Sequence, residues 1–117
     1  MKTKEHKHGE NSVTEILEDG VILKNGQDFL SILYSSPSGK IILKKENIAD
    51  EFFDLKTGIA GDIFQKASNY QAQLGIVGDF SNVESKSLRD LIYESNKSGK
   101  IIFKNSTEEV FDIFLKQ

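Results

Sequence analysis

The sequence predicts an α/β domain, a mixed sheet of about five strands with helices packed on it, in the order β-β-α-β-α-β-α-β-α. Three short apolar runs, at residues 40–44, 73–78 and 100–104, have the length and the composition of buried strands. Stretches whose apolar residues recur at helical spacing separate these runs. Strands joined through helices pair in parallel by right-handed crossovers, so we expect a parallel sheet with an N-terminal hairpin at one side.

The N-terminal residues divide into a predicted tail and a predicted hairpin. Residues 1–10 are polar, so we expect a flexible tail outside a single domain of residues 11–117. Residues 12–17 and 21–23 are rich in β-branched and aliphatic side chains, and a glycine ends the turn between them, which predicts a hairpin of these two strands. His6 and His8 have no third ligand nearby, so we interpret them as solvated side chains rather than a metal site.

Helical spacing predicts four helices, at residues 28–35, 55–69, 85–95 and from 106 to the C-terminus. The second helix has one apolar stripe, and Asp54 is well placed as its N-cap. Gly58 and Gly61 lie on one turn of this helix, which indicates that another part of the structure packs close to the backbone there. Capping-box spacing marks the starts of the last two helices, at residues 87–90 and 106–109.

The amino-acid composition excludes several classes of protein and of functional site. The chain has 117 residues, of which 38% are hydrophobic and 28% charged, as in one compact domain. No apolar run approaches the roughly 20 residues that cross a bilayer, and no secretory signal is evident, so we expect a cytoplasmic protein without membrane contact. The net charge of -3 argues against nucleic acid as a partner. The absence of cysteine excludes disulfides, thiolate catalysis and Cys-based zinc sites, and no motif indicates a cofactor.

Two resemblances accompany this pattern. Residues 52–58, 76–81, 85–90 and 93–96 resemble a bacterial family named domain of unknown function 4180. The order of elements, with a loop and a helix N-terminus after the third strand, resembles the STAS fold of sulfate-transporter and anti-sigma-factor-antagonist domains, also called SpoIIAA-like. In STAS domains that antagonise anti-sigma factors, a partner kinase phosphorylates a serine or threonine at the start of the second helix. This resemblance implies Thr57 as the corresponding hydroxyl, in a motif altered by Leu55 and Lys56 after Asp54.

A candidate site follows from the strand ends. Ligands bind at the carboxyl ends of parallel strands, so the residues after two neighbouring strands should meet in one crevice. These are Lys44, Lys45, Glu46 and Asn47 after one strand, and Asp79, Phe80 and Ser81 after the next. Lys56, Thr57 and Gly58 at a helix N-terminus have the composition of an anion cradle, and the alternative is a helix capped by Asp54 beside a solvated lysine. We assign the candidate ligand or partner surface to Phe53, Asp54, Lys56, Thr57, Gly58, Asp79, Ser81 and Arg89.

Some roles within this surface have two interpretations. Phe52 and Phe53 are adjacent, so either one ring is exposed as part of a partner site or an irregular turn buries both. Asp79 and Arg89 are expected to form an ion pair that fixes the loop, in preference to an acid–base pair. Asp54 and Asp79 are the only candidate carboxylates for catalysis, and we assign no catalytic residue.

The functional hypothesis is therefore a non-enzymatic protein-interaction or regulatory module that resembles STAS domains. It implies an unidentified protein partner and a monomer or homodimer. The alternative is a small-molecule or anion-binding sensor, with or without hydrolytic activity, that uses the crevice at the strand ends. Phosphorylation of Thr57 is a third hypothesis, which follows from the STAS resemblance.

Overall fold

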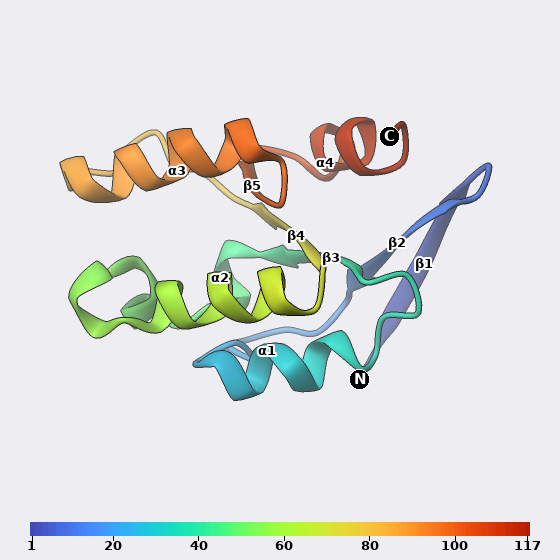
Figure 1. Ribbon diagram of the computed structural model, residues 1–117, viewed down its shortest axis with the longest axis horizontal. Helices are drawn as coiled ribbons and strands as arrows, with labels where there is room; N and C mark the ends of the chain where they lie inside the picture. Colours follow the sequence, from blue (N-terminus) through green and yellow to red (C-terminus); the bar gives the residue numbers. More distant parts are fainter.

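A five-stranded sheet with its strands in sequential order forms the centre of the molecule (Figure 1). The computed structural model describes all 117 residues. The first two strands pair antiparallel, and every later pair of neighbours is parallel. The strands are β1 (Thr3–His8), β2 (Asn11–Ile16), β3 (Lys40–Lys44), β4 (Gln73–Val77) and β5 (Ile101–Lys104). This arrangement confirms the predicted α/β class, the mixed sheet and the presence of an N-terminal hairpin.

Helices cover the two faces of the sheet unequally. They are α1 (Gly26–Leu33), α2 (Ile59–Asn69), α3 (Lys86–Ser98) and α4 (Thr107–Phe114). Because the strand order is sequential and such crossovers are right-handed, α1, α2 and α3 fall on one face, where they lie in a row (Figure 1). Helix α4 follows the last strand and contacts β2 to β5 from the opposite face. None of these helices combines the length and the apolar composition that a membrane crossing requires.

Alternation of side chains along the strands builds a core on each face of the sheet. Ile41 and Leu43 of β3 join the larger core beneath α1 to α3, whereas Ile42 joins the smaller core beneath α4. Gly75 of β4 also lies on the α4 face, because a Cβ at this position would lie 2.6 Å from Cγ1 of Val110. The missing side chain lets α4 approach the sheet closely.

The N-terminal hairpin forms from different residues than predicted. Residues 1–10 are not a tail outside the fold, since β1 lies within them and pairs with β2 along its whole length. The predicted return strand, residues 21–23, contributes only an isolated parallel bridge between Leu23 and Ile48. The predicted boundary between a tail and a domain at residue 11 is therefore wrong, because the sheet begins at Thr3.

The polar composition of β1 explains why this strand was missed. A strand at the edge of a sheet is held largely by backbone pairing, so it needs few apolar side chains. His6 provides the main side-chain anchor, and it is not the solvated side chain expected. Its Nε2 lies 2.8 Å from Oε1 of Glu15, and its ring packs against Phe111 of α4 with ring centres 4.5 Å apart. His8 is exposed.

The region between β3 and α2 consists of short turns. Three single-turn 3-10 helices follow β3, namely η1 (Lys45–Asn47), η2 (Asp50–Phe53) and η3 (Leu55–Thr57). Helix α2 therefore begins at Ile59, later than predicted, and Asp54 caps η3 instead of α2. Gly58 separates the two with a φ of 78°, a left-handed conformation that favours glycine. The expected close packing on Gly58 and Gly61 is wrong, since a Cβ at either position would meet no atom within 4 Å.

Serine hydroxyls cap the last two helices. Ser85 caps α3 by accepting a hydrogen bond from the N–H of Leu88, so the capping box predicted at residues 87–90 is wrong. Ser106 caps α4 by accepting from the N–H of Glu109, which confirms the predicted position of that cap.

The two edges of the sheet differ. In β5 the carbonyl of Lys104 bonds to β4, so the backbone groups of Ile101 and Phe103 point outward. The amide of Asn96 bonds to both groups of Phe103, since its Oδ1 accepts from the N–H of Phe103 at 2.7 Å and its Nδ2 donates to the carbonyl of Phe103 at 3.3 Å. The hydroxyl of Ser95 donates to the carbonyl of Ile101. Side chains of α3 thus close the β5 edge, while β1 carries no comparable cover.

Candidate functional site

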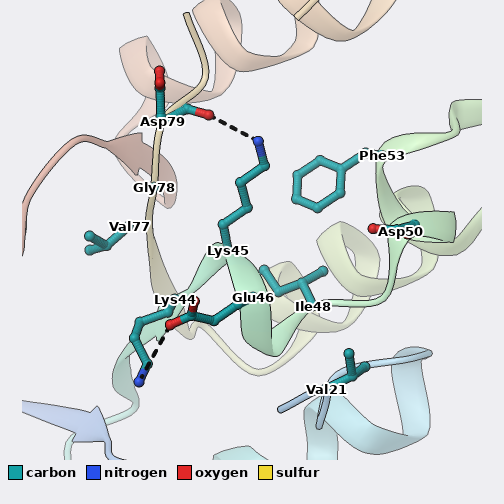
Figure 2. Close-up of a pocket in the computed structure, with 10 residues that line it drawn as sticks. All are labelled: Val21, Lys44, Lys45, Glu46, Ile48, Asp50, Phe53, Val77, Gly78 and Asp79. Atoms are coloured by element: carbon teal, nitrogen blue, oxygen red, sulfur yellow. Dashed lines mark hydrogen bonds and ion pairs between the residues drawn. The ribbon is translucent and has the colours of Figure 1, made fainter. Parts of the chain in front are cut away.

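An open crevice of about 580 Å³ lies at the carboxyl ends of β3 and β4 (Figure 2). We call it the strand-end crevice, and it is lined by Val21, Lys44, Lys45, Glu46, Ile48, Asp50, Phe53, Val77, Gly78 and Asp79. A neighbouring cavity of about 300 Å³ extends toward the start of α3 and shares Lys45, Asp50, Phe53 and Asp79 with the crevice. This is the position at which open α/β sheets commonly bind ligands.

Asn47, the last residue of η1, holds one wall of the crevice in place. Its side chain is fully buried. The Nδ2 group donates to the carbonyls of Glu18 and Gly20 at 3.0 and 2.9 Å, and Oδ1 accepts from the N–H of Lys44 at 3.0 Å. The carbonyl of Asn47 accepts two further hydrogen bonds from N–H groups of the same loop, residues 18–23. One buried residue thereby ties this loop to the end of β3.

Lys45 extends across the crevice beside Phe53, as Figure 2 shows, and its Nζ donates to the backbone carbonyl of Asp79 at 2.9 Å. The same ammonium lies 5.9 Å from the centre of the Phe53 ring and 5.1 Å from the centre of the Phe80 ring, within the range of cation–π contacts. Gly78 makes room for the stem of this lysine, because a Cβ at Gly78 would lie 2.6 Å from Cβ of Lys45.

A cluster of four phenylalanine rings joins the core to the crevice and to the neighbouring cavity. Phe52 is fully buried and packs edge-on against Phe53, with ring centres 5.0 Å apart. Phe53 is only partly buried, and its ring centre lies 6.2 Å from that of Phe80. Phe80 in turn packs edge-on against Phe103 of β5 at 5.4 Å. Of the two interpretations of the Phe52–Phe53 pair, the structure supports the one in which a single ring reaches the surface.

Asp79 is held by its own loop. Its Oδ1 accepts hydrogen bonds from the hydroxyl and the N–H of Ser81, at 2.6 and 2.9 Å. The side-chain bond from Ser81 is the main reason that the pKa of Asp79 is lowered from its ordinary value of 3.8, and the backbone bond and the charge of Lys45 act in the same direction. The predicted ion pair with Arg89 is wrong, because the guanidinium of Arg89 donates to two carbonyls of the preceding loop at 3.0 and 2.8 Å.

Acid should remove the contribution of the Asp79 carboxylate to stability. A carboxyl whose folded pKa is lowered stabilises the fold above its unfolded pKa, and this stabilisation is lost as the pH falls through the folded value. The difference in unfolding free energy between the wild type and Asp79→Asn should therefore shrink below about pH 4. Urea unfolding of both proteins from neutral to acidic pH measures this difference. The difference between the wild type and Asp62→Asn should also shrink in acid, since a hydrogen bond from Lys66 lowers the pKa of Asp62. A pH-independent difference would contradict this expectation.

The segment predicted to cradle an anion is a closed turn. Oγ1 of Thr57 lies 2.7 Å from the carbonyl oxygen of Glu51 and 2.8 Å from that of Asp54, so these two acceptors share its proton. The same oxygen accepts a hydrogen bond from the N–H of Ile59 at 3.2 Å. The hydroxyl thus joins η2, η3 and the start of α2. Gly58 lines a different cavity, of about 280 Å³, between α2 and α3.

The structure brings only part of the predicted surface together. Phe53 and Asp79 line the strand-end crevice. The other predicted residues lie outside its lining, namely Asp54, Lys56, Thr57, Gly58, Ser81 and Arg89. Lys44, Lys45 and Glu46 line the crevice as the strand ends predicted, although we did not assign them to the candidate surface. Asp50 is the charged lining residue that the sequence did not indicate, because its place depends on the turn after β3. No group of three or more His, Asp or Glu side chains is placed to hold a metal ion.

The fold and the crevice define a five-stranded α/β domain with an open site at the carboxyl ends of its parallel strands. The chain belongs to the family described as Domain of unknown function (DUF4180), whose model matches residues 8–113. This match confirms the family resemblance seen in the sequence. No curated protein and no solved structure matches the chain, so the STAS resemblance stays a prediction.

Proposed function

We propose that the protein is a non-enzymatic interaction module that binds a partner protein through the strand-end crevice. The observation that carries this proposal is a pair of partly exposed rings inside a charged rim, Phe53 in the crevice and Phe80 in the neighbouring cavity. Aromatic side chains surrounded by polar groups are typical of the centre of protein–protein interfaces. The open shape of the crevice suits a protruding side chain of a partner.

The hydrogen bonds of the rim support binding more than catalysis. The ammonium of Lys45 bonds to a backbone carbonyl, and that of Lys44 lies 3.7 Å from the carboxylate of Glu46. Asp79 does contact a hydroxyl, that of Ser81, but a carboxyl with a lowered pKa is a weak general base at neutral pH. These groups therefore shape a binding surface better than they would activate a nucleophile.

The finer parts of the proposal come from the STAS resemblance. The sequential order of the parallel strands and the turns that lead from β3 into α2 support a STAS-like fold and, with it, a regulatory role in the cytoplasm. Phosphorylation of Thr57 stays a prediction. A phosphate there would break the hydrogen bonds from the hydroxyl to Glu51 and Asp54, and would rearrange the turn beside the crevice. Intact-mass measurement of protein purified from its own cells tests for the modification, and its absence under all growth conditions would contradict it.

Crosslinking in native cells tests the interaction. A photo-reactive amino acid at position 50 should capture one protein, and Glu46→Lys or Phe53→Leu should abolish that capture because both change the crevice while preserving its fold. The control is the same crosslinker at Tyr70, an exposed residue at the end of α2 outside the crevice. No capture at position 50, or capture that both crevice variants leave intact, would contradict the proposal.

Binding of a small anion is the second candidate function. Lys44 and Lys45 both line the crevice, at the strand ends where ligands commonly bind. A thermal-shift screen with phosphate and metabolite carboxylates tests this candidate. It predicts a stabilising anion whose effect is lost in Lys45→Met, whereas an interaction module predicts no such anion.

A further inference from the structure

We propose that the strand-end crevice binds a positively charged side chain, an arginine or lysine of the partner protein, in the place now occupied by the ammonium of Lys45. This inference rests on the proposed interaction function and names the group that the site recognises.

The contacts of Lys45 are those of a bound cation. Its ammonium lies 5.9 and 5.1 Å from the ring centres of Phe53 and Phe80, and it donates to the carbonyl of Asp79 at 2.9 Å. Two aromatic rings and an oxygen acceptor form the usual recognition site for an organic cation. The chain itself therefore shows which chemical group fits this position.

Lys45 can leave this place without disturbing the core. Its side chain is exposed, and its ammonium makes one hydrogen bond, to a backbone carbonyl. The fixed part of the residue is the stem, which packs over Gly78, where a Cβ would lie 2.6 Å from Cβ and 3.1 Å from Cδ of Lys45. Rotation of the outer part of the lysine would free both rings, and the buried residues beneath would keep their positions.

The charge of the region favours a cation. The charged residues that line the crevice or the neighbouring cavity are two lysines and four acids, namely Lys44, Lys45, Glu46, Asp50, Asp79 and Glu84. The acids thus outnumber the lysines even with Lys45 in place. Asp79 is a carboxylate at neutral pH, and the bonds from Ser81 lower its pKa further below the ordinary value. A cation that replaced Lys45 would meet an acidic rim, whereas an anion would meet repulsion.

The space suits the larger of the two cationic side chains. Lys45 lines both the crevice of about 580 Å³ and the neighbouring cavity of about 300 Å³, so it lies at their common boundary. Its departure would join the two spaces next to Phe53 and Phe80. A planar guanidinium stacks on aromatic rings and donates in several directions, to the Asp79 carbonyl and to a carboxylate, so arginine fits better than lysine.

Peptide binding to the full chain tests the inference. Nitrogen-15 NMR titration with an end-capped tetra-arginine peptide should shift the amide signals of Phe53 and Phe80 in the wild type. In Lys45→Met, which keeps the stem but removes the competing ammonium, we expect binding roughly three- to tenfold tighter, on the scale of one or two cation–π contacts. The matched control is Lys100→Met, which makes the same charge change before β5, at the other end of the strands. Phe80→Leu in the Lys45→Met background should remove the gain.

Three results would overturn the inference. The first is an equal gain in tetra-arginine affinity in Lys45→Met and Lys100→Met, and the second is no tetra-arginine binding to either the wild type or Lys45→Met. The third is binding of a tetra-glutamate peptide that Lys45→Met abolishes. The last result would make Lys45 a ligand for anions. The interaction function fails separately, because capture of a partner at position 50 does not depend on tetra-arginine binding. Capture that Glu46→Lys abolishes, together with no peptide binding, would leave the interaction module intact and remove the cation site.

Discussion

Replacing Asn47 by alanine should destabilise the protein by roughly 2–4 kcal/mol, since each buried polar group left without a partner costs about 1–3 kcal/mol. The change removes the bonds of the side chain to the carbonyls of Glu18 and Gly20 and to the N–H of Lys44. Water can reach the carbonyl of Gly20, which is exposed, and can replace the bond that this carbonyl loses. The loss of stability is therefore smaller than the sum of the penalties for three unbonded backbone groups.

Urea unfolding followed by circular dichroism measures the effect of Asn47→Ala. Asn82→Ala, in the exposed loop after β4, is the matched control and should change stability by less than about 0.5 kcal/mol. Asn47→Asp should be at least as damaging at neutral pH, because it sets a buried carboxylate against two carbonyl oxygens. Its penalty should decrease in acid, where the carboxyl is protonated. Equal stability of Asn47→Ala and Asn82→Ala would contradict the role given to Asn47.

Gly75→Ala should destabilise the protein by about 1–3 kcal/mol through steric overlap in a packed core. The added Cβ would lie 2.6 Å from Cγ1 and 3.0 Å from Cγ2 of Val110, so α4 would have to move away from the sheet. Gly75 has no positive φ, so backbone strain does not add to this overlap.

A double-variant cycle isolates the contact between Gly75 and Val110. Combining Gly75→Ala with Val110→Ala should recover part of the loss, because the smaller side chain leaves space for the new methyl group. Gly61→Ala is the glycine control, since it adds a methyl group in open space within α2 and should be neutral or stabilising by up to about 1 kcal/mol. Strictly additive effects of Gly75→Ala and Val110→Ala would show that the contact does not limit the packing of α4.

The parallel part of the sheet could be predicted because its strands are continuous apolar runs. Residues 41–43 and 101–103 are buried on both faces of the sheet, so nearly every side chain in these strands is apolar and indicates a buried strand. The first strand could not be predicted in this way. Its faces are largely solvated and its pairing is made by backbone atoms, which carry no sequence pattern. The turn predicted at Gly20 then favoured residues 21–23, instead of β1, as the hairpin partner of β2.

The position of the candidate site could be predicted better than its residues. Strand ends converge whatever their side chains, so the location of a crevice followed from topology alone. Which side chains line it depends on the 3-10 turns after β3, and these turns have no hydrophobic period. They place Asp50 and Phe53 at the crevice and turn Lys56 and Thr57 away from its lining. The ion pair expected between Asp79 and Arg89 failed for a similar reason, because each side chain is bound by its own loop.

The amide of Asn96 on the β5 edge limits how copies of this chain could assemble. Growth of a strand-paired filament needs two receptive edges on every subunit, one to add to and one to extend from. Here Asn96 bonds to the N–H and the carbonyl of Phe103 and Ser95 bonds to the carbonyl of Ile101, so β1 is the more receptive edge. Pairing of β1 with β1 of a second copy would consume the last free edge of both molecules. Strand association of this kind would therefore end at two copies, and replacing Asn96 by alanine would uncover the backbone groups of Phe103 on the second edge that a polymer requires.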